Sequence, residues 1–146
     1  MGSLSLPASG VVHVDAQVCI YTVERHTAYG PLLQPLWQAV QGQTVEVAAS
    51  ELTLMETLIV PYRNGDSVLA SDYEQFFQQP GVRLLPITQP ILREAARLRA
   101  TTKLRTPDAI HAATASLAGC VLFVTNDRGF KAVPGLPLVV LDDLIP

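Results

Sequence analysis

The sequence predicts a single α/β domain with three layers, in which helices cover both faces of a central, mostly parallel five-stranded sheet. Three observations lead to this prediction. The chain has 146 residues, the usual size of one domain, and 49% of them are hydrophobic. Short apolar runs alternate with helical patterns along the chain, as they do in α/β proteins. The runs are continuously apolar, which is typical of parallel strands that are buried on both faces.

Five apolar runs are expected to form the strands. They are short and mostly rich in β-branched residues, which favour a pleated and buried backbone. In chain order they are residues 11–14, 44–49, 82–86, 121–124 and 138–141. Because parallel strands are joined by right-handed crossovers, we expect the carboxyl ends of all five to meet at one edge of the sheet.

Helical patterns fill the intervals between these runs. Their expected bounds are residues 18–24, 32–41, 51–63, 67–79, 90–103 and 108–118. Ser50, Asp66, Thr88 and Thr106 are placed to cap four of these helices, because their side-chain oxygens can accept hydrogen bonds from the first N–H groups. The whole chain, residues 1–146, is expected to be one domain, with residues 1–10 as a flexible N-terminal extension.

Composition argues against several classes of protein. Charged residues make up only 16% of the chain and the net charge is −3, which argues against disorder and against a general attraction to nucleic acid. The apolar runs are far shorter than the ~20 residues of a membrane-spanning helix. The N-terminal residues lack the basic and apolar parts of a secretory signal, and two cysteines are too few for a disulfide framework. The expected location is the cytoplasm, without membrane contact.

Four acids are placed where a parallel sheet gathers its ligands. Asp15 follows the first predicted strand and Asp127 follows the fourth, whereas Asp108 and Glu56 lie on predicted helices. Ligands of open α/β sheets bind outside the carboxyl ends of the strands. Two carboxylates about 4 Å apart repel each other by roughly 1 to 4 kcal/mol, and Mg²⁺ or Mn²⁺ bound between them removes that penalty. Each acid taken alone also has an ordinary structural explanation, as a turn residue or a first-turn helix residue.

Four segments of the chain resemble the PIN domain family, and specifically its VapC-like toxin ribonucleases. Each segment carries one of the four acids, in the family's order; the segments are residues 12–17, 50–56, 104–115 and 123–130. The third segment resembles the pattern L-x-x-x-D-A-x-H-x-A-x-A and is the most specific of the four. Ala16 and Gln17 depart from the family, which commonly has a small hydroxyl residue and then Asn or Ser after the first Asp.

The resemblance implies a PIN-like fold and a Mg²⁺- or Mn²⁺-dependent endoribonuclease, the toxin of a type II toxin–antitoxin pair, which hydrolyses RNA phosphodiester bonds. Asp15, Glu56, Asp108 and Asp127 would hold one or two metal ions, and Thr125 would orient Asp127 or a water at the metal. The implied partners are an RNA substrate, a small antitoxin protein and a second copy of the chain.

Two other functions remain open at this point. The departure at Ala16 and Gln17 is compatible with a catalytically weak PIN-fold module that binds RNA or protein. A phosphotransfer receiver or a haloacid-type phosphatase also places Asp at strand ends, although Lys103 and Lys131 are poorly placed for the lysine that those mechanisms need.

Half of the ten basic residues fall between positions 93 and 105. Because a phosphate backbone needs positive surroundings, the candidate RNA contacts are Arg93, Arg97, Lys103 and Arg105, together with Arg128. The alternative is a solvated helix face.

Three further features have predominantly structural interpretations. His13 and His111 are expected to be packed histidines, although His111 is also a candidate substrate contact. Asp142 and Asp143 are expected to be solvated. Apolar and aromatic side chains of the first two predicted helices resemble the surface that meets an antitoxin and a second copy, with packing against the sheet as the alternative; they are Tyr21, Tyr29, Leu32, Leu33, Leu36 and Trp37.

Overall fold

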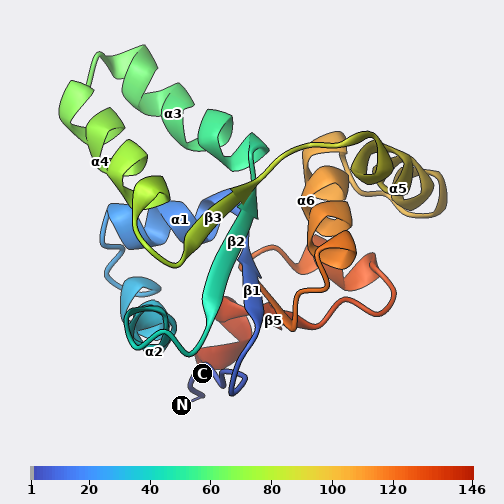
Figure 1. Cartoon of the computed structure of the whole chain (residues 1–146), viewed down its shortest axis with the longest axis horizontal. Helices are drawn as coiled ribbons and strands as arrows, with labels where there is room; N and C mark the ends of the chain where they lie inside the picture. The colour runs from blue at the N-terminus through green and yellow to red at the C-terminus, as the bar shows by residue number, and fades with distance from the viewer. Residues whose placement is uncertain (1) are drawn as a thin grey trace.

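The structure, a computed structural model, describes residues 2–146 and confirms the three-layer architecture (Figure 1). Within that range the central sheet has five strands, all parallel, in the order β3-β2-β1-β4-β5. The strands are β1 (Val11–Val14), β2 (Glu46–Ser50), β3 (Val82–Leu85), β4 (Leu122–Thr125) and β5 (Leu138–Val140). All five predicted strands are present, with bounds that differ from the prediction by at most two residues.

Helices cover both faces of this sheet. Figure 1 shows α1 to α4 on one side and α5 and α6 on the other. The helices are α1 (Ala16–Val23), α2 (Gly30–Gln41), α3 (Leu52–Asn64), α4 (Ser67–Gln78), α5 (Gln89–Thr101) and α6 (Thr106–Leu117), with the short 3-10 helices η1 (Arg128–Ala132) and η2 (Leu141–Leu144) near the C-terminus. None of the helices described within residues 2–146 is both long and apolar enough to cross a membrane.

Two hydrophobic cores lie on the two faces of the sheet. Successive strand residues point to opposite faces, so Val12 and Val14 pack beneath α1 to α4. Phe123 belongs to the core beneath α5 and α6, where His13 stacks on its ring at a centroid distance of 4.9 Å. His13 is fully buried, which confirms its structural role.

Two predicted helix caps are confirmed and two are wrong. Asp66 accepts a hydrogen bond from Leu69 N–H, and Thr88 accepts one from Ile91 N–H. Ser50 instead ends β2, and its hydroxyl oxygen accepts from Leu52 N–H while Glu51 occupies the cap position. Thr106 is already the first residue of α6, with Arg105 at the cap position, and its hydroxyl oxygen accepts from the guanidinium of Arg99 at 2.9 Å.

The N-terminal segment differs from its expected form. In the described part, residues 2–10, the Leu4 side chain is buried in the core beneath α1 to α4. Gly2 N–H donates to the carbonyl oxygen of Leu144 at 3.1 Å. This segment therefore lies against the domain; Met1 is outside the described residues.

The order of the strands determines where a site can form. The chain runs from β1 outward to β2 and β3, then crosses the other face and returns to place β4 on the opposite side of β1. The direction of winding therefore reverses between β1 and β4. A crevice opens at such a reversal, outside the carboxyl ends of the two strands.

Candidate functional site

A hollow of about 550 Å³ opens at the carboxyl ends of β1 and β4. We call it the acidic hollow; its lining residues are Asp15, Gln17, Tyr21, Glu56, Asp108, His111, Asn126, Asp127, Arg128 and Asp142. The four acids singled out by the sequence come from four separate parts of the chain. The fold brings all four to this one hollow.

Asp15 and Thr125 are neighbours because of the strand register. Val14 of β1 pairs with Val124 of β4, so the next residue of each strand lies at the same edge. The Thr125 hydroxyl donates to Asp15 Oδ2, and its oxygen accepts from Asp127 N–H at 3.0 Å. Asp15 Oδ1 accepts from Val18 N–H at 3.2 Å, because Asp15 is also the N-cap of α1. Thr125 thus contacts both the Asp15 carboxylate and the Asp127 backbone. The family resemblance implied that it orients Asp127 or a water, and did not point to the contact with Asp15.

Glu56 is held by a histidine from the opposite helical layer. His111 Nε2 lies 2.6 Å from Glu56 Oε1, and the His111 side chain is only 2% exposed. The expectation of a packed helix histidine was therefore incomplete, because this ring also contacts a site carboxylate. Spacing along α6 places His111 near Asp108, but it cannot reveal a partner that lies 55 residues earlier in the chain.

Asp108 and Asp127 complete the set of acids. Asp108 lies in the first turn of α6, where the helix dipole favours a negative charge. Arg105 Nε lies 3.9 Å from Asp108 Oδ2. Asp127 caps η1, and its Oδ1 accepts from Gly129 N–H at 2.8 Å.

The electrostatics of the acidic hollow oppose the accumulation of negative charge. Burial raises the pKa of Asp15, and the charge of Asp127 adds to this, although hydrogen bonds from Thr125 and Val18 act in the other direction. Burial also raises the pKa of Asp108, with the charges of Asp127 and Glu56 adding to it and Arg105 opposing it. A position at a helix N-terminus alone would lower both pKa values, so the two acids carry a cost of burial and repulsion that this position does not explain.

The donor set fits a hard divalent cation. Carboxylate oxygens are the ligands that Mg²⁺ and Mn²⁺ prefer, and a bound cation would offset the burial and the repulsion that together raise these pKa values. Among residues 2–146, no three His, Cys, Asp or Glu side chains already converge as a cluster that could hold a metal ion. The carboxylates instead line the hollow, and three of the four are held by hydrogen bonds to the protein.

The candidate RNA contacts are divided between two places. In the part of the chain that the structure describes, Arg128 lines the acidic hollow, whereas the other four candidates do not. Arg97 pairs with Glu94 at 3.1 Å and Arg93 donates to Gln89 at 3.1 Å, both along the exposed side of α5. Lys103 follows α5 in an exposed loop. Arg93 and Arg97 therefore lie on α5 away from the wall of the hollow, whereas Arg105 lies beside Asp108, which is in that wall.

Sequence reasoning missed Tyr21, Asn126 and Asp142 as lining residues. Asp142 was expected to be solvated, but its Oδ1 accepts from the Tyr29 hydroxyl at 2.5 Å and its N–H donates to Asn126 Oδ1 at 2.9 Å. The expectation is right for Asp143, which is exposed and pairs with Arg128. Nothing local in the sequence distinguishes the two acids, because the difference comes from the return of β5 beside β4.

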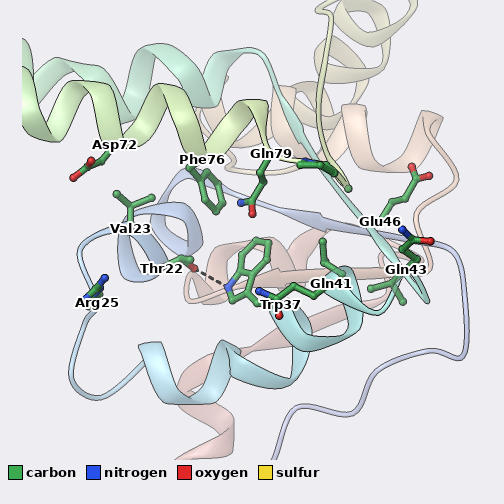
Figure 2. Close-up of a pocket in the computed structure, with 14 residues that line it drawn as sticks. Thr22, Val23, Arg25, Trp37, Gln41, Gln43, Glu46, Asp72, Phe76 and Gln79 are labelled. Atoms are coloured by element: carbon green, nitrogen blue, oxygen red, sulfur yellow. Dashed lines mark hydrogen bonds between the residues drawn. The ribbon is translucent and has the colours of Figure 1, made fainter.

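A second and larger cavity, of about 810 Å³, lies at the opposite edge of the sheet, near the amino ends of β2 and β3 (Figure 2). We call it the Trp37 groove; its lining residues are Thr22, Val23, Arg25, Trp37, Val40, Gln41, Gln43, Val45, Glu46, Asp72, Phe76, Gln79, Pro80 and Gly81. Trp37 Nε1 donates to the Thr22 hydroxyl oxygen at 3.1 Å, the dashed line in Figure 2, and its ring meets Phe76 edge-on.

Burial distinguishes the two interpretations of the apolar side chains on the first two helices, which were core packing and a surface for an antitoxin. Leu33 and Leu36 are fully buried in the core, so for them the packing interpretation is correct. Trp37 is only partly buried and forms part of the groove floor.

Comparisons with known proteins agree with the fold. The chain resembles VapBC2 from Rickettsia felis, whose structure was solved bound to a DNA fragment from its promoter, with a TM-score of 0.74 and 17% identity over 89% of this chain and 98% of that one. It resembles a toxin–antitoxin complex from Klebsiella pneumoniae with a TM-score of 0.67 and 21% identity, over 89% and 97% of the two chains. It also resembles VapC20 from Mycobacterium tuberculosis, a toxin that cleaves the sarcin–ricin loop, with a TM-score of 0.68 and 18% identity, over 84% and 95%.

Sequence comparison identifies the family. No curated protein matches the chain in sequence. A sequence profile described as the PIN domain matches residues 12–136, which include the four acids and all of the sheet except Val11 of β1 and the whole of β5. The chain therefore belongs to the PIN domain family.

Proposed function

We propose that the protein is a Mg²⁺- or Mn²⁺-dependent endoribonuclease and the toxin of a toxin–antitoxin pair. The observation that carries this proposal is the convergence of Asp15, Glu56, Asp108 and Asp127 on one hollow at the β1–β4 reversal. Structural relatives that are toxins, one of which cleaves the sarcin–ricin loop, support the same function.

The four carboxylates would hold the cation, and the residues behind them orient those carboxylates. Thr125 and Val18 N–H direct the Asp15 oxygens, while His111 directs Glu56. When bound, a divalent cation lowers the pKa of a water molecule and stabilises charge on the phosphate. The hollow itself supplies negative charge, so it accepts a phosphodiester only together with the cation.

The test is a cleavage assay on structured RNA with the purified full chain. We expect no cleavage in EDTA and cleavage after Mg²⁺ or Mn²⁺ is added. Cleavage that proceeds without a divalent cation would contradict the proposal. If the protein binds RNA with the cation but never cleaves it, the weak-binding module suggested by Ala16 and Gln17 is the better description.

The antitoxin docks in the Trp37 groove under this proposal. Trp37 and Phe76 are in contact in the lining of the groove, where Arg25 and Asp72 are also exposed. Glu46 lines the groove too, but it already pairs with Arg83 at 3.1 Å. The contact between the two rings suits a peptide with apolar side chains, and the exposed Asp72 can pair with a basic one. Co-expression with the protein of a neighbouring short reading frame, followed by size-exclusion chromatography, tests this: Trp37→Ala should weaken the complex and Tyr62→Ala should not.

A homodimer is also part of the proposal, and its surface is the exposed side of α3. Met55, Ile59 and Tyr62 are exposed and follow one another at intervals of four and three residues, so they share one helical face. A twofold pair of identical chains can cover this face on both copies at once. Light scattering should report a dimer for the native chain and a monomer for Ile59→Glu; a monomeric native chain would contradict this part.

A further inference from the structure

Three aromatic rings form a compact cluster beside the acidic hollow. We call Tyr21, His26 and Tyr29 the aromatic cluster. The ring centroids of Tyr21 and Tyr29 are 4.5 Å apart, those of His26 and Tyr29 are 4.8 Å apart, and those of Tyr21 and His26 are 4.9 Å apart. Each ring therefore contacts the other two.

The backbone of the loop between α1 and α2 holds the outermost ring. His26 Nδ1 accepts from both Ala28 N–H and Tyr29 N–H, each at 3.2 Å. His26 N–H donates to the Tyr21 carbonyl oxygen, and the His26 carbonyl oxygen accepts from Gly30 N–H, both at 2.9 Å. Because Nδ1 serves as an acceptor, the neutral ring carries its proton on Nε2.

Hydrogen bonds join this cluster to the lining of the acidic hollow. Tyr21 itself lines the hollow, and its hydroxyl oxygen accepts from Asn126 Nδ2 at 3.1 Å. The Tyr29 hydroxyl donates to Asp142, which also lines the hollow. Tyr21 is 8% exposed, whereas His26 is exposed, so the cluster extends from the wall of the hollow to solvent.

We propose that the aromatic cluster is a stacking site for an unpaired nucleobase of the RNA whose phosphate enters the acidic hollow. This inference rests on the proposed ribonuclease function. Bases stack on aromatic side chains whatever their sequence, but only when they are free of a duplex stack. The site therefore selects single-stranded or looped RNA over duplex RNA. His26 Nε2–H adds a donor for an oxygen of the same nucleotide.

The aromatic cluster offers a kind of contact that neither the acids nor the basic residues supply. The hollow repels phosphate until a cation binds, so a contact that does not depend on charge would add affinity beside it. Stacking supplies such affinity. It also positions one nucleotide relative to the carboxylates, because the cluster and Asp127 are joined through the adjacent Asn126.

The test compares binding of three probes by fluorescence anisotropy in Mg²⁺, in the Asp108→Asn background to prevent cleavage. The probes are a 12-nucleotide single-stranded RNA of mixed sequence, its duplex, and the same sugar–phosphate chain without bases. We expect the single-stranded RNA to bind most tightly. His26→Ala should weaken that binding about 5- to 100-fold and leave the abasic chain unchanged, since stacking is worth about 1–3 kcal/mol per base.

Two control variants keep the test informative. His26→Phe retains an aromatic face and should bind the single-stranded RNA within about twofold of the parent. Val68→Ala removes an exposed apolar side chain on α4, outside both the cluster and the hollow, and should change nothing. Unfolding midpoints measured by circular dichroism check that every variant is folded.

The outcomes distinguish failure of the stacking site from failure of the proposed ribonuclease function. Equal affinity for the RNA and the abasic chain, or full RNA affinity in His26→Ala, overturns the stacking site while leaving the ribonuclease intact. Equal losses for both probes in His26→Ala also overturn it, because they indicate a phosphate contact or a disturbed loop. Absence of both RNA binding and metal-dependent cleavage by the native chain overturns the proposed function and this inference together.

Discussion

The acidic hollow and the Trp37 groove lie at opposite edges of the same sheet and differ in what fills their walls. The groove is the larger, about 810 Å³ against about 550 Å³, yet its acids Glu46 and Asp72 lie on an exposed rim. The hollow gathers carboxylates beside the buried Asp15, whose pKa burial raises. Volume alone would favour the groove as a candidate site, whereas carboxylates with raised pKa values favour the hollow.

The parallel sheet explains this difference. Its carboxyl edge at the β1–β4 reversal receives residues that follow two neighbouring strands, Asp15 and Asp127. Its amino edge receives the ends of α2 and α4 and the turns before β2 and β3, which supply apolar and amide side chains. Under the proposed function, one edge would hold a cation and the other would hold a polypeptide.

The largest contrast is expected from the same substitution made in each cavity. Asp108→Asn should lower kcat/KM for RNA cleavage at least about 100-fold. Losing a residue that only hydrogen-bonds to a metal ligand costs about 10- to 100-fold, and losing a proposed ligand itself should cost more. Asp72→Asn, the matched change in the Trp37 groove, should leave cleavage within about twofold. Equal effects of the two variants in a steady-state cleavage assay would contradict the proposed difference between the hollow and the groove.

The next effect concerns the hydroxyl beneath the acids. Thr125→Val leaves Asp15 Oδ2 buried without its donor, so cleavage should fall about 10- to 100-fold and the free energy of unfolding by about 1–3 kcal/mol. Thr125→Ser keeps the hydroxyl and should recover most of both. Urea unfolding and cleavage rates report the two quantities; a fully active Thr125→Val protein would show that this contact is dispensable.

A pH-dependent effect, confined to acid pH and to stability, is expected beneath the hollow. Burial lowers the pKa of His13 to about 3, with the nearby His111 adding to the shift. The unfolded chain binds this proton near pH 6.5, so the folded state loses stability as the pH falls from about 6.5 toward 3, by up to about 1.4 kcal/mol per pH unit. Above pH 6.5 the contribution is complete.

His13→Leu should remove this part of the pH dependence. Urea unfolding of both proteins at pH 7.0, 5.5 and 4.5 measures it as the difference between their two slopes. Parallel curves would mean that His13 is protonated without cost in the folded protein, which its burial and its unpaired ring nitrogens within the described chain argue against.

The smallest effect is expected in the Trp37 groove. Trp37→Phe removes the hydrogen bond to Thr22 and should lower the free energy of unfolding by about 1 kcal/mol. Cleavage should not change, since the groove lies at the other edge of the sheet. A loss of cleavage without a loss of stability would show that the Trp37 groove also contributes to cleavage, which would contradict the separate roles proposed for the two cavities.

Most of the fold was accessible from the sequence because parallel strands and capped helices leave local signals. The continuous apolar runs located all five strands, and Asp66 and Thr88 marked true helix starts. Thr106 is not a cap, and the partner of its hydroxyl, Arg99, comes from another helix. Local patterns cannot report such a contact.

The candidate site was only partly accessible for the same reason. The four acids were found by their positions after strands and by the family pattern, and the fold gathers them in one hollow. The contacts from His111 to Glu56 and from Thr125 to Asp15 depend on strand order and helix packing, which one sequence does not encode locally. Asp142 was missed because only the return of β5 brings it to the hollow.

Mn²⁺ binding, measured by titration calorimetry, tests the central claim most directly because it needs no RNA. The native chain should bind Mn²⁺, and Asp15→Asn, Glu56→Gln, Asp108→Asn and Asp127→Asn should each weaken binding at least about tenfold, while Asp72→Asn should not. Mn²⁺ affinity that is unchanged in all four variants would contradict the account, because the acidic hollow would then not be the metal site.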